Sequence, residues 1–301
     1  MRKFLLYICI TIAGLAVSDR LVGLVICSMT GGFYAAPVER AKESQAQVAI
    51  IGASRASHHY DPQILDDSIH MTACNYGVEA MNIYGHYAML SLLFDHGAIP
   101  HLVIVDLSES DVCDVTGWNT ERLNYLYPYV EEHAVDAMLA DIIEPCEMFF
   151  VRHSVLYRHN SRLVDYAKWL LLDFDLYASN GYTPMKGVWK GKPKEDLQQK
   201  YAISPQKLSY LERLIRLCEE HDVRLVLSIS PNYKILPKHQ RWVEAVGQMA
   251  RKHGATFINN EQDNDFLAHP EWFNDPYHLN ETGAEIFTIK FIRQLCLQKT
   301  N

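Results

Sequence analysis

Short apolar runs alternate with stretches of helical periodicity from residue 48 to the end of the chain. The runs that have the length and composition of buried strands are Val48–Ile51, Thr72–Asn75, His101–Asp106, Arg224–Ile229 and Thr256–Ile258. The third of these, HLVIVD, is Val-rich and apolar, as expected of a strand that is covered on both faces. This alternation of strands and helices predicts a three-layer α/β domain built on a parallel sheet of about five strands.

The segments between the strands carry apolar residues every three or four positions, which predicts helices. Asn82 is a good N-cap for a helix that ends near Gly97. Two further helices are expected at Pro205–His221 and Trp242–His253. Asn280 is expected to cap the last helix of the chain.

Residues 112–200 interrupt this alternation. They are rich in Tyr and Trp, with helical patterns at Val135–Ile143 and Ser161–Leu172. We interpret them as a mostly helical insertion at the carboxyl end of a strand, where sheets of this kind bind ligands. Their aromatic residues could shape a substrate groove or pack as a helical cap. Residues 31–47 are predicted to be a connector, and residues 48–299 to be the α/β domain.

The first thirty residues have the pattern of a signal or membrane anchor. Arg2 and Lys3 precede an apolar run from Phe4 to Val17. No small-x-small cleavage site follows, and Ile26 is too large for the residue that precedes a lipoprotein cysteine. We therefore expect an uncleaved transmembrane helix with its N-terminus inside, as in a bacterial inner membrane, and a periplasmic α/β domain.

Two charged residues interrupt the apolar N-terminus. Asp19 and Arg20 separate the first apolar run from a second run, Leu21–Cys27. Charges in the middle of a membrane span are costly. The span is therefore expected either to extend past them or to leave the second run in the membrane interface. In the remaining alternative, the first helix is buried in a cytoplasmic protein.

Composition and motifs argue against a nucleic-acid partner, paired cysteines and a bound metal or cofactor. The 301 residues carry a net charge of −8, and no long Lys/Arg run is present, so a nucleic-acid partner is not expected. The seven cysteines form no CxxC pair and are interpreted as free thiols. No HExxH motif and no Cys/His cluster with zinc spacing occurs, so neither a metal nor a cofactor is predicted.

Ser54 is the first candidate for chemistry. The segment AIIGASR places it just after the first predicted strand, at the edge of the sheet that faces a ligand. A serine becomes a nucleophile only beside a base that a third group orients. His58 and His59 are near in sequence but have no evident carboxylate partner, so we interpret them as surface or packing residues.

A better base lies near the end of the chain, in the segment FNDPYHLNETG. Asp275 and His278 are three residues apart in a loop that Pro276 stiffens. This spacing lets the carboxylate reach one ring nitrogen of His278 and stabilise the imidazolium after the other nitrogen takes a proton. Because the carboxyl ends of parallel strands open on one side, this loop can meet Ser54.

Three segments in this order resemble the blocks of the SGNH (GDSL-type) hydrolase and acyltransferase superfamily. IIGASR is similar to the first block, with Ser54 as nucleophile, and NYGVEAMN to the second, whose Gly77 would donate a backbone N–H to the oxyanion. DPYHLN is similar to the last block, with Asp275 and His278. The resemblance covers residues 48–111 and 201–297, is closest to membrane-anchored members with a GxSR first block, and implies a flavodoxin-like sheet and acyl-ester chemistry.

One departure from the family concerns the oxyanion. The third block usually supplies an asparagine, but DLSESD follows the third predicted strand here. The backbone N–H groups of Ser54 and Gly77 would then remain as donors, with the Ser108 hydroxyl or the Asn75 or Asn82 amide as further candidates. In studied serine hydrolases, loss of one donor lowers the rate by about 10²- to 10³-fold.

Arg55 is expected either to support the Ser54 turn by pairing with Asp106 or Glu109, or to face solvent.

The leading hypothesis is an esterase or O-acyltransferase that acts on acyl (acetyl) esters of cell-envelope glycans through a Ser-His-Asp triad. The alternative is a non-catalytic binding or assembly protein of the envelope on the same scaffold.

Overall fold

The structure is a computed structural model that describes residues 1–27, 35–115, 122–172, 178–197 and 201–297. The chain divides into two compact units. We call Met1–Ala35 with Leu123–Leu176 the helical unit, and Ala36–Arg122 with Tyr177–Asn301 the sheet unit.

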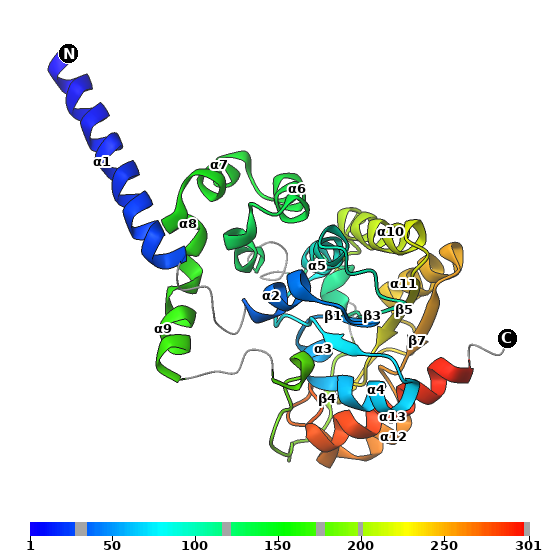
Figure 1. Cartoon of the computed structure of the whole chain (residues 1–301). Coiled ribbons are helices and arrows are strands. Elements are labelled where there is room, and N and C mark those ends of the chain that lie inside the picture. The colour runs from blue at the N-terminus through cyan, green and yellow to red at the C-terminus, as the bar shows by residue number, and fades with distance from the viewer. Residues whose placement is uncertain (28–34, 116–121, 173–177, 198–200, 298–301) are drawn as a thin grey trace. The chain divides into compact units, whose positions relative to one another are not determined.

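The sheet unit contains the predicted parallel sheet (Figure 1). Its strands are β1 (Val48–Gly52), β2 (Ala73–Asn75), β3 (Leu102–Asp106), β5 (Arg224–Ile229) and β7 (Thr256–Asn259). Their order is β2-β1-β3-β5-β7, and every neighbouring pair is parallel. The α/β prediction is confirmed, with each strand within one residue of its expected bounds. Gly52, Asp106 and Ser228 lie side by side at the carboxyl edge of the sheet.

Helices cover both faces of this sheet (Figure 1). One face carries α5 (Ile83–Asp95), α10 (Pro205–Glu220) and α11 (Arg241–His253). The other carries α3 (Ser54–His59), α4 (Pro62–Ile69) and α13 (Glu281–Leu297). Short elements complete the unit: α12 (Asn264–Ala268), η1 (Glu109–Asp111), η5 (Ala178–Gly181) and η6 (Pro270–Trp272).

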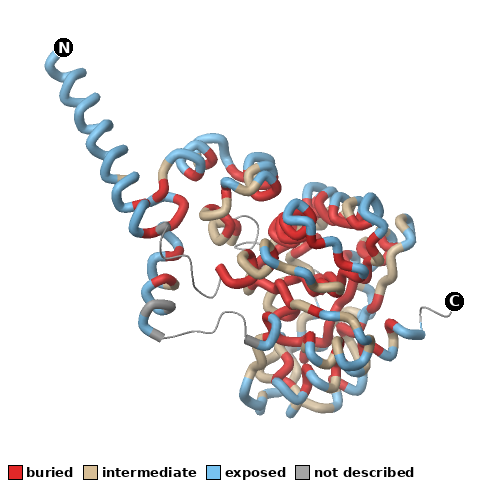
Figure 2. Tube along the Cα trace, viewed as in Figure 1, coloured by how far each residue is buried: buried red, intermediate tan, exposed pale blue. Residues whose placement is uncertain are grey.

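The predicted caps are present. The Asn82 side chain accepts a hydrogen bond from the Tyr84 N–H at the start of α5, and Asn280 accepts one from the Gly283 N–H in the first turn of α13. Strands β1 and β3 are buried along their whole length, as is β5 after its first residue, whereas the edge strand β7 is largely half-buried (Figure 2). Apolar side chains of the helices pack against the central strands. Tyr182 and Trp189 of the predicted insertion also pack in this core. For these two aromatics, packing is the observed role.

Several short elements of the sheet unit were not predicted, among them α3, α4 and α12. The connector contains a helix, α2 (Ala36–Glu43), because Val38 and Ala41 form a small apolar face that is buried beside α5. A two-stranded parallel pair joins β4 (Lys194–Glu195) to β6 (Lys234–Ile235). This pair holds the end of the insertion against the loop that follows β5.

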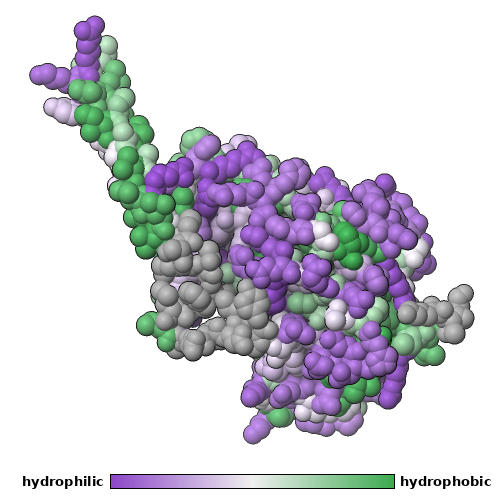
Figure 3. All heavy atoms as spheres, in the orientation of Figure 1, coloured by the Kyte–Doolittle hydropathy of each residue, from purple (hydrophilic) through white to green (hydrophobic). Residues whose placement is uncertain are grey.

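The helical unit consists of α1 (Arg2–Cys27), α6 (His133–Ile142), α7 (Pro145–His153), α8 (Val155–His159) and α9 (Leu163–Leu172), with short turns η2 (Leu123–Tyr125), η3 (Tyr127–Tyr129) and η4 (Asn160–Arg162). The two predicted insertion helices correspond to α6 and α9. Helix α1 continues through Asp19 and Arg20 without a break. It is apolar along most of its length and long enough to cross a membrane (Figure 3).

Candidate active site

The turn after β1 places Ser54 at the carboxyl edge of the sheet. Gly52 ends the strand with φ 156°, and Ser54 is the first residue of α3. A Cβ atom on Gly52 would lie 2.7 Å from Ala56 Cβ and 2.8 Å from the Asp106 carbonyl oxygen. Only glycine allows α3 to begin so close to β3, so the Gly-x-Ser sequence has a local steric reason.

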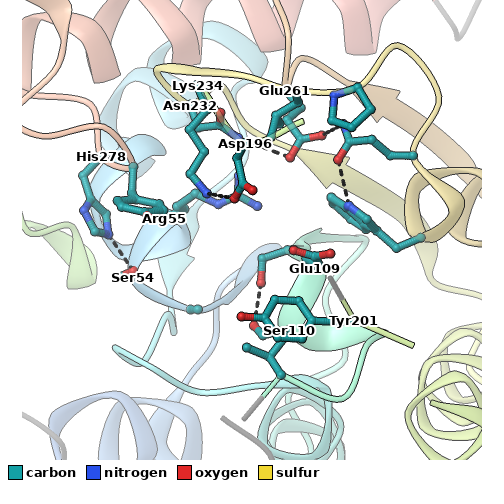
Figure 4. Close-up of a pocket in the computed structure, with 18 residues that line it drawn as sticks. Ser54, Arg55, Glu109, Ser110, Asp196, Tyr201, Asn232, Lys234, Glu261 and His278 are labelled. Atoms are coloured by element: carbon teal, nitrogen blue, oxygen red, sulfur yellow. Dashed lines mark hydrogen bonds and ion pairs between the residues drawn. The ribbon is translucent and has the colours of Figure 1, made fainter. Parts of the chain in front are cut away.

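Ser54, His278 and Asp275 form a continuous hydrogen-bonded chain, of which Figure 4 shows the contact between Ser54 and His278. Ser54 Oγ lies 2.8 Å from His278 Nε2, although the two residues are 224 positions apart. His278 Nδ1 lies 2.9 Å from Asp275 Oδ2 and 3.0 Å from Oδ1. Since the carboxylate accepts the Nδ1 proton, Nε2 is left to accept the proton of the serine hydroxyl.

Asp275 is held as an anion by its own loop. Its Oδ1 accepts hydrogen bonds from the backbone N–H groups of Tyr277 at 2.7 Å and His278 at 3.0 Å. Burial acts to raise the pKa of Asp275, but the bonds from the His278 ring and these N–H groups lower it below its usual value. The carboxylate is therefore ionised at neutral pH and can stabilise an imidazolium.

His59 forms hydrogen bonds that hold the loop containing His278 in place. Its Nε2 accepts the N–H of Leu279 at 2.9 Å, and its Nδ1 lies 2.9 Å from Ser230 Oγ. Burial, with the nearby His278, Arg55 and His58, lowers the pKa of His59 well below its usual value. His59 is thus a neutral ring that ties the residue after His278 to the end of β5.

His58 is also buried. It lies 2.6 Å from the Thr183 carbonyl oxygen through Nδ1 and 3.1 Å from Glu79 Oε1 through Nε2. The hydrogen bond from His58 lowers the pKa of Glu79 against the opposing effect of burial. For both histidines, packing is the correct interpretation and a surface position is wrong.

Arg55 is buried beneath the Ser54 turn and pairs with Asp106, Nε to Oδ2 at 3.4 Å. Its guanidinium also donates to the carbonyl oxygens of Leu107 and Ser230. Burial raises the pKa of Asp106, although Arg55 and hydrogen bonds from Tyr60 and Ser230 oppose that rise. Arg55 therefore ties α3 to the ends of β3 and β5 and does not face solvent.

Two of the predicted oxyanion donors, the Gly77 N–H and the Asn75 amide, have other partners in this structure. The Gly77 N–H donates to Asn75 Oδ1 at 2.9 Å. Asn75 Nδ2 in turn donates to the carbonyl oxygens of Ala56 at 2.7 Å and Tyr60 at 3.1 Å, which uses both of its hydrogens. Gly77 would have to give up its bond to Asn75 before it could bind an oxyanion.

The Ser108 hydroxyl is also engaged, because it donates to Asp111 Oδ2 at 2.8 Å. Asn82 caps α5 by accepting the Tyr84 N–H with its side-chain oxygen. The Ser54 N–H lies in the first turn of α3, where backbone N–H groups have no partner within the helix. The Ser54 N–H therefore has no bond within the helix to give up before it binds a substrate oxygen.

A pocket of about 590 Å³ opens beside Ser54 and His278 (Figure 4). Its other lining residues are Ala53, Arg55, Ser108, Glu109, Ser110, Val115, Asp196, Tyr201, Asn232, Lys234, Leu236, Pro237, Gln240, Trp242, Glu261 and Tyr277. Many of them come from the loops that follow β5 and β7. Both loops sit at the same carboxyl edge as Ser54, which is the signal that could have identified them in the sequence.

Charged and amide groups in the pocket are paired with one another. Buried Glu261 accepts hydrogen bonds from Asn232 at 3.2 Å and Gln240 at 2.6 Å, and burial raises its pKa. Lys234 Nζ lies 3.8 Å from Asp196 Oδ2 and 4.3 Å from the centre of the Tyr277 ring. These residues therefore give the pocket lining polar groups beside an aromatic ring.

Within the described ranges, no group of three or more His, Cys, Asp or Glu side chains is arranged to hold a metal ion. Beside the pocket lie the Ser54 hydroxyl, the His278 imidazole and the Asp275 carboxylate, each hydrogen-bonded to the next.

No family model matches this sequence, and no curated protein matches it. The similar solved structures include a candidate acylhydrolase from Bacteroides fragilis, with 9% identity over 84% of this chain and 86% of that one and a TM-score of 0.42. A mutant acetyl-xylooligosaccharide esterase from Geobacillus stearothermophilus has 9% identity over 83% and 94%, with a TM-score of 0.41. At such identities no residue role is transferred from those proteins to this chain.

Proposed function

We propose that this chain is a membrane-anchored, periplasmic serine esterase or O-acyltransferase. The observation that carries the proposal is the 2.8 Å contact between Ser54 Oγ and His278 Nε2, with Asp275 on the other ring nitrogen. A serine hydroxyl in this setting has a base within hydrogen-bond reach and an oriented tautomer, which are the requirements for nucleophilic attack on an ester.

In the first half of the reaction, Ser54 Oγ attacks the acyl carbonyl carbon and His278 Nε2 takes the hydroxyl proton. The carbonyl oxygen becomes an oxyanion, for which the Ser54 N–H is a donor. When the bond from carbon to the alcohol oxygen breaks, His278 gives its proton to the departing alcohol. The acyl group is then bound to Ser54, and Asp275 has stabilised the imidazolium throughout.

In the second half, an acceptor hydroxyl occupies the place of the departed alcohol. His278 Nε2 removes its proton while its oxygen attacks the acyl carbon, and the proton then returns to Ser54 Oγ as the acyl bond to serine breaks. With water as acceptor the enzyme releases a carboxylic acid, and with a sugar hydroxyl it transfers the acyl group. The same three side chains serve both reactions.

The substrate class that we favour is an acylated, in particular an acetylated, glycan of the cell envelope. The pocket combines the aromatic residues Tyr201, Trp242 and Tyr277 with amide and carboxylate groups such as Asn232 and Glu261. Apolar faces with a few convergent polar groups suit an oriented organic ligand, and a sugar offers both C–H faces and hydroxyls. The candidate span α1 would hold the enzyme beside such polymers.

The test compares the parent chain with Ser54→Ala on p-nitrophenyl acetate and on an acetylated polysaccharide. We expect Ser54→Ala to lose activity on both substrates, because no other nucleophile stands beside His278 Nε2 among the described residues. Ser57→Ala is the matched control: Ser57 is in the same helix and buried, and its hydroxyl contacts the Ala53 carbonyl oxygen. Equal activity in Ser54→Ala and the parent would end the serine mechanism.

The second candidate is a non-catalytic envelope protein that binds glycan. The observation that favours it is the engagement of the Gly77 N–H by Asn75 and of the Ser108 hydroxyl by Asp111. Calorimetric binding with an acetylated polysaccharide, followed by an assay of released acetate, separates the two. Binding without any acetate release or transfer by the parent chain would favour the binding protein.

A further inference from the structure

Exposed apolar side chains are concentrated in one part of the helical unit. Beyond residue 27, fourteen large apolar side chains of the described residues are exposed, and seven of them lie between residues 149 and 171. These seven are Phe149, Phe150, Leu156, Tyr157, Leu163, Val164 and Leu171. The other seven are scattered through the sheet unit. A dense set of exposed apolar residues indicates contact with something other than water.

The length of α1 shows where a membrane would have to lie. The apolar core of a bilayer is about 30 Å thick. At 1.5 Å per residue, Phe4–Ser18 reaches about 22 Å, whereas Phe4–Ile26 reaches about 34 Å. A complete crossing by α1 therefore takes in Asp19 and Arg20, so these two charges need partners at the edge of the apolar layer.

The junction between α7 and α8 supplies those partners. The Asp19 carboxylate accepts three hydrogen bonds from the start of α8: the Ser154 hydroxyl at 2.6 Å, the Val155 N–H at 2.9 Å and the Leu156 N–H at 3.0 Å. Arg20 Nη2 donates to the His153 carbonyl oxygen at 2.9 Å. The negative charge of Asp19 thus binds backbone N–H groups at the N-terminus of α8, and the positive charge of Arg20 binds a carbonyl oxygen at the C-terminus of α7. The helix dipole favours these signs at these ends.

Packing continues beyond this pair, where α1 and α8 lie side by side (Figure 1). A Cβ atom on Gly23 would lie 2.9 Å from Val155 Cγ1, and Ile26 is only 5% exposed. Leu24 on the same stretch of α1 remains 73% exposed. This part of α1 therefore has one face on α8 and an apolar face without protein cover.

We propose that the helical unit is embedded in the membrane interface. In this arrangement α7, α8 and α9 insert their exposed apolar side chains among the lipids beside α1, and the α7–α8 junction neutralises Asp19 and Arg20 there. The partner of this surface is the bilayer that α1 crosses. The proposal depends on α1 as an anchor and is independent of the chemistry of Ser54.

The experiment measures the depth of single labels in the full chain, reconstituted in vesicles of phosphatidylethanolamine and phosphatidylglycerol. The native cysteines are replaced by alanine, and an environment-sensitive fluorophore is attached to Phe150→Cys or Leu163→Cys. Leu15→Cys, which is 66% exposed on α1, provides the lipid reference. Glu285→Cys, exposed on α13 of the sheet unit, provides the water reference.

We expect labels at positions 150 and 163 to lose iodide quenching to the level of position 15 and to be quenched by nitroxide-bearing lipids. Iodide quenching equal to that of position 285 would overturn the proposal. So would protection from iodide without quenching by the lipid nitroxides, because protein would then cover the surface. If position 15 is also open to iodide, the anchor itself is wrong and the proposal falls with it, while the Ser54→Ala assay still tests the proposed activity.

Discussion

His59 connects the candidate base to the sheet. It accepts the Leu279 N–H and contacts Ser230 Oγ, while being completely buried. A proton added to Nε2 would remove the acceptor for Leu279 and place a charge beside Arg55. The position of His278 therefore depends on a histidine that stays neutral.

This dependence predicts a pH effect on stability. Because the folded-state pKa of His59 is below 6.5, only the unfolded chain takes up this proton as the pH falls below 6.5, so His59 makes the folded state less stable at lower pH. His59→Gln can keep both hydrogen bonds but cannot titrate. We expect the thermal unfolding midpoint of the parent in detergent to fall more steeply from pH 7 to pH 5 than that of His59→Gln. Parallel profiles would contradict this role.

At the residue scale, the sequence predicted the side chains that carry a motif and offered the pairing of Arg55 with Asp106 as one alternative, but it did not predict the supporting contacts of His59 and Glu261. Ser54, Asp275 and His278 stand in short segments where spacing alone limits their possible partners. His59 and Glu261 have no such local pattern. The contacts of His59 span 171 and 220 residues and those of Glu261 span 21 and 29 residues, so they form only after the strands are in register. The bond from the Gly77 N–H to the Asn75 side chain spans only two residues, but the sequence did not show that Asn75 would turn its oxygen toward Gly77.

Two adjacent charges on α1 determine how this helix meets α7 and α8. Asp19 acts as an N-cap for α8 from a distant part of the chain, in addition to the local cap provided by Ser154. This explains why α1 tolerates charged residues within an otherwise apolar helix. Asp19 and Arg20 thus hold α1 against the junction between α7 and α8.

We predict that Asp19→Ala loosens the start of α8. Loss of an N-cap carboxylate costs about 1 kcal/mol, which corresponds to roughly fivefold faster local opening. Hydrogen–deuterium exchange of the full chain in lipid nanodiscs should show this change at residues 155–159. Glu144→Gln is the control, because Glu144 occupies the N-cap position of α7 without a capping bond among the described residues. Unchanged exchange in α8 of Asp19→Ala would contradict the packing role.

At the element scale, the periodicity of apolar residues predicted the bounds of the main strands and long helices but did not reveal the shortest elements. The strands and the helices α5, α10, α11 and α13 have continuous apolar patterns, so their bounds could be predicted to within a few residues. Helix α2 has one apolar face of two residues, and β4 and β6 are two residues each. Elements of this size form because of the partner that they pack against, which a local pattern does not reveal.

At the scale of the whole molecule, the parallel sheet explains how distant segments form one site. The turn after β1, the loops after β5 and β7 and the segment before α13 all reach its carboxyl edge, and residues from each line one pocket. The predicted parallel sheet implied that these loops would meet, because parallel strands share their carboxyl edge. It did not imply that the chain divides into a sheet unit and a helical unit that includes α1, since that division depends on the contact between α1 and the insertion.

The proposed serine mechanism is tested most directly by covalent labelling of the full chain with a serine-directed fluorophosphonate, mapped by peptide mass spectrometry. We expect one adduct, on Ser54, and a labelling rate that His278→Ala lowers by about 10²- to 10⁴-fold, as for loss of a general base. Absence of an adduct on Ser54 in the folded parent, or an adduct whose rate does not change in His278→Ala, would contradict it.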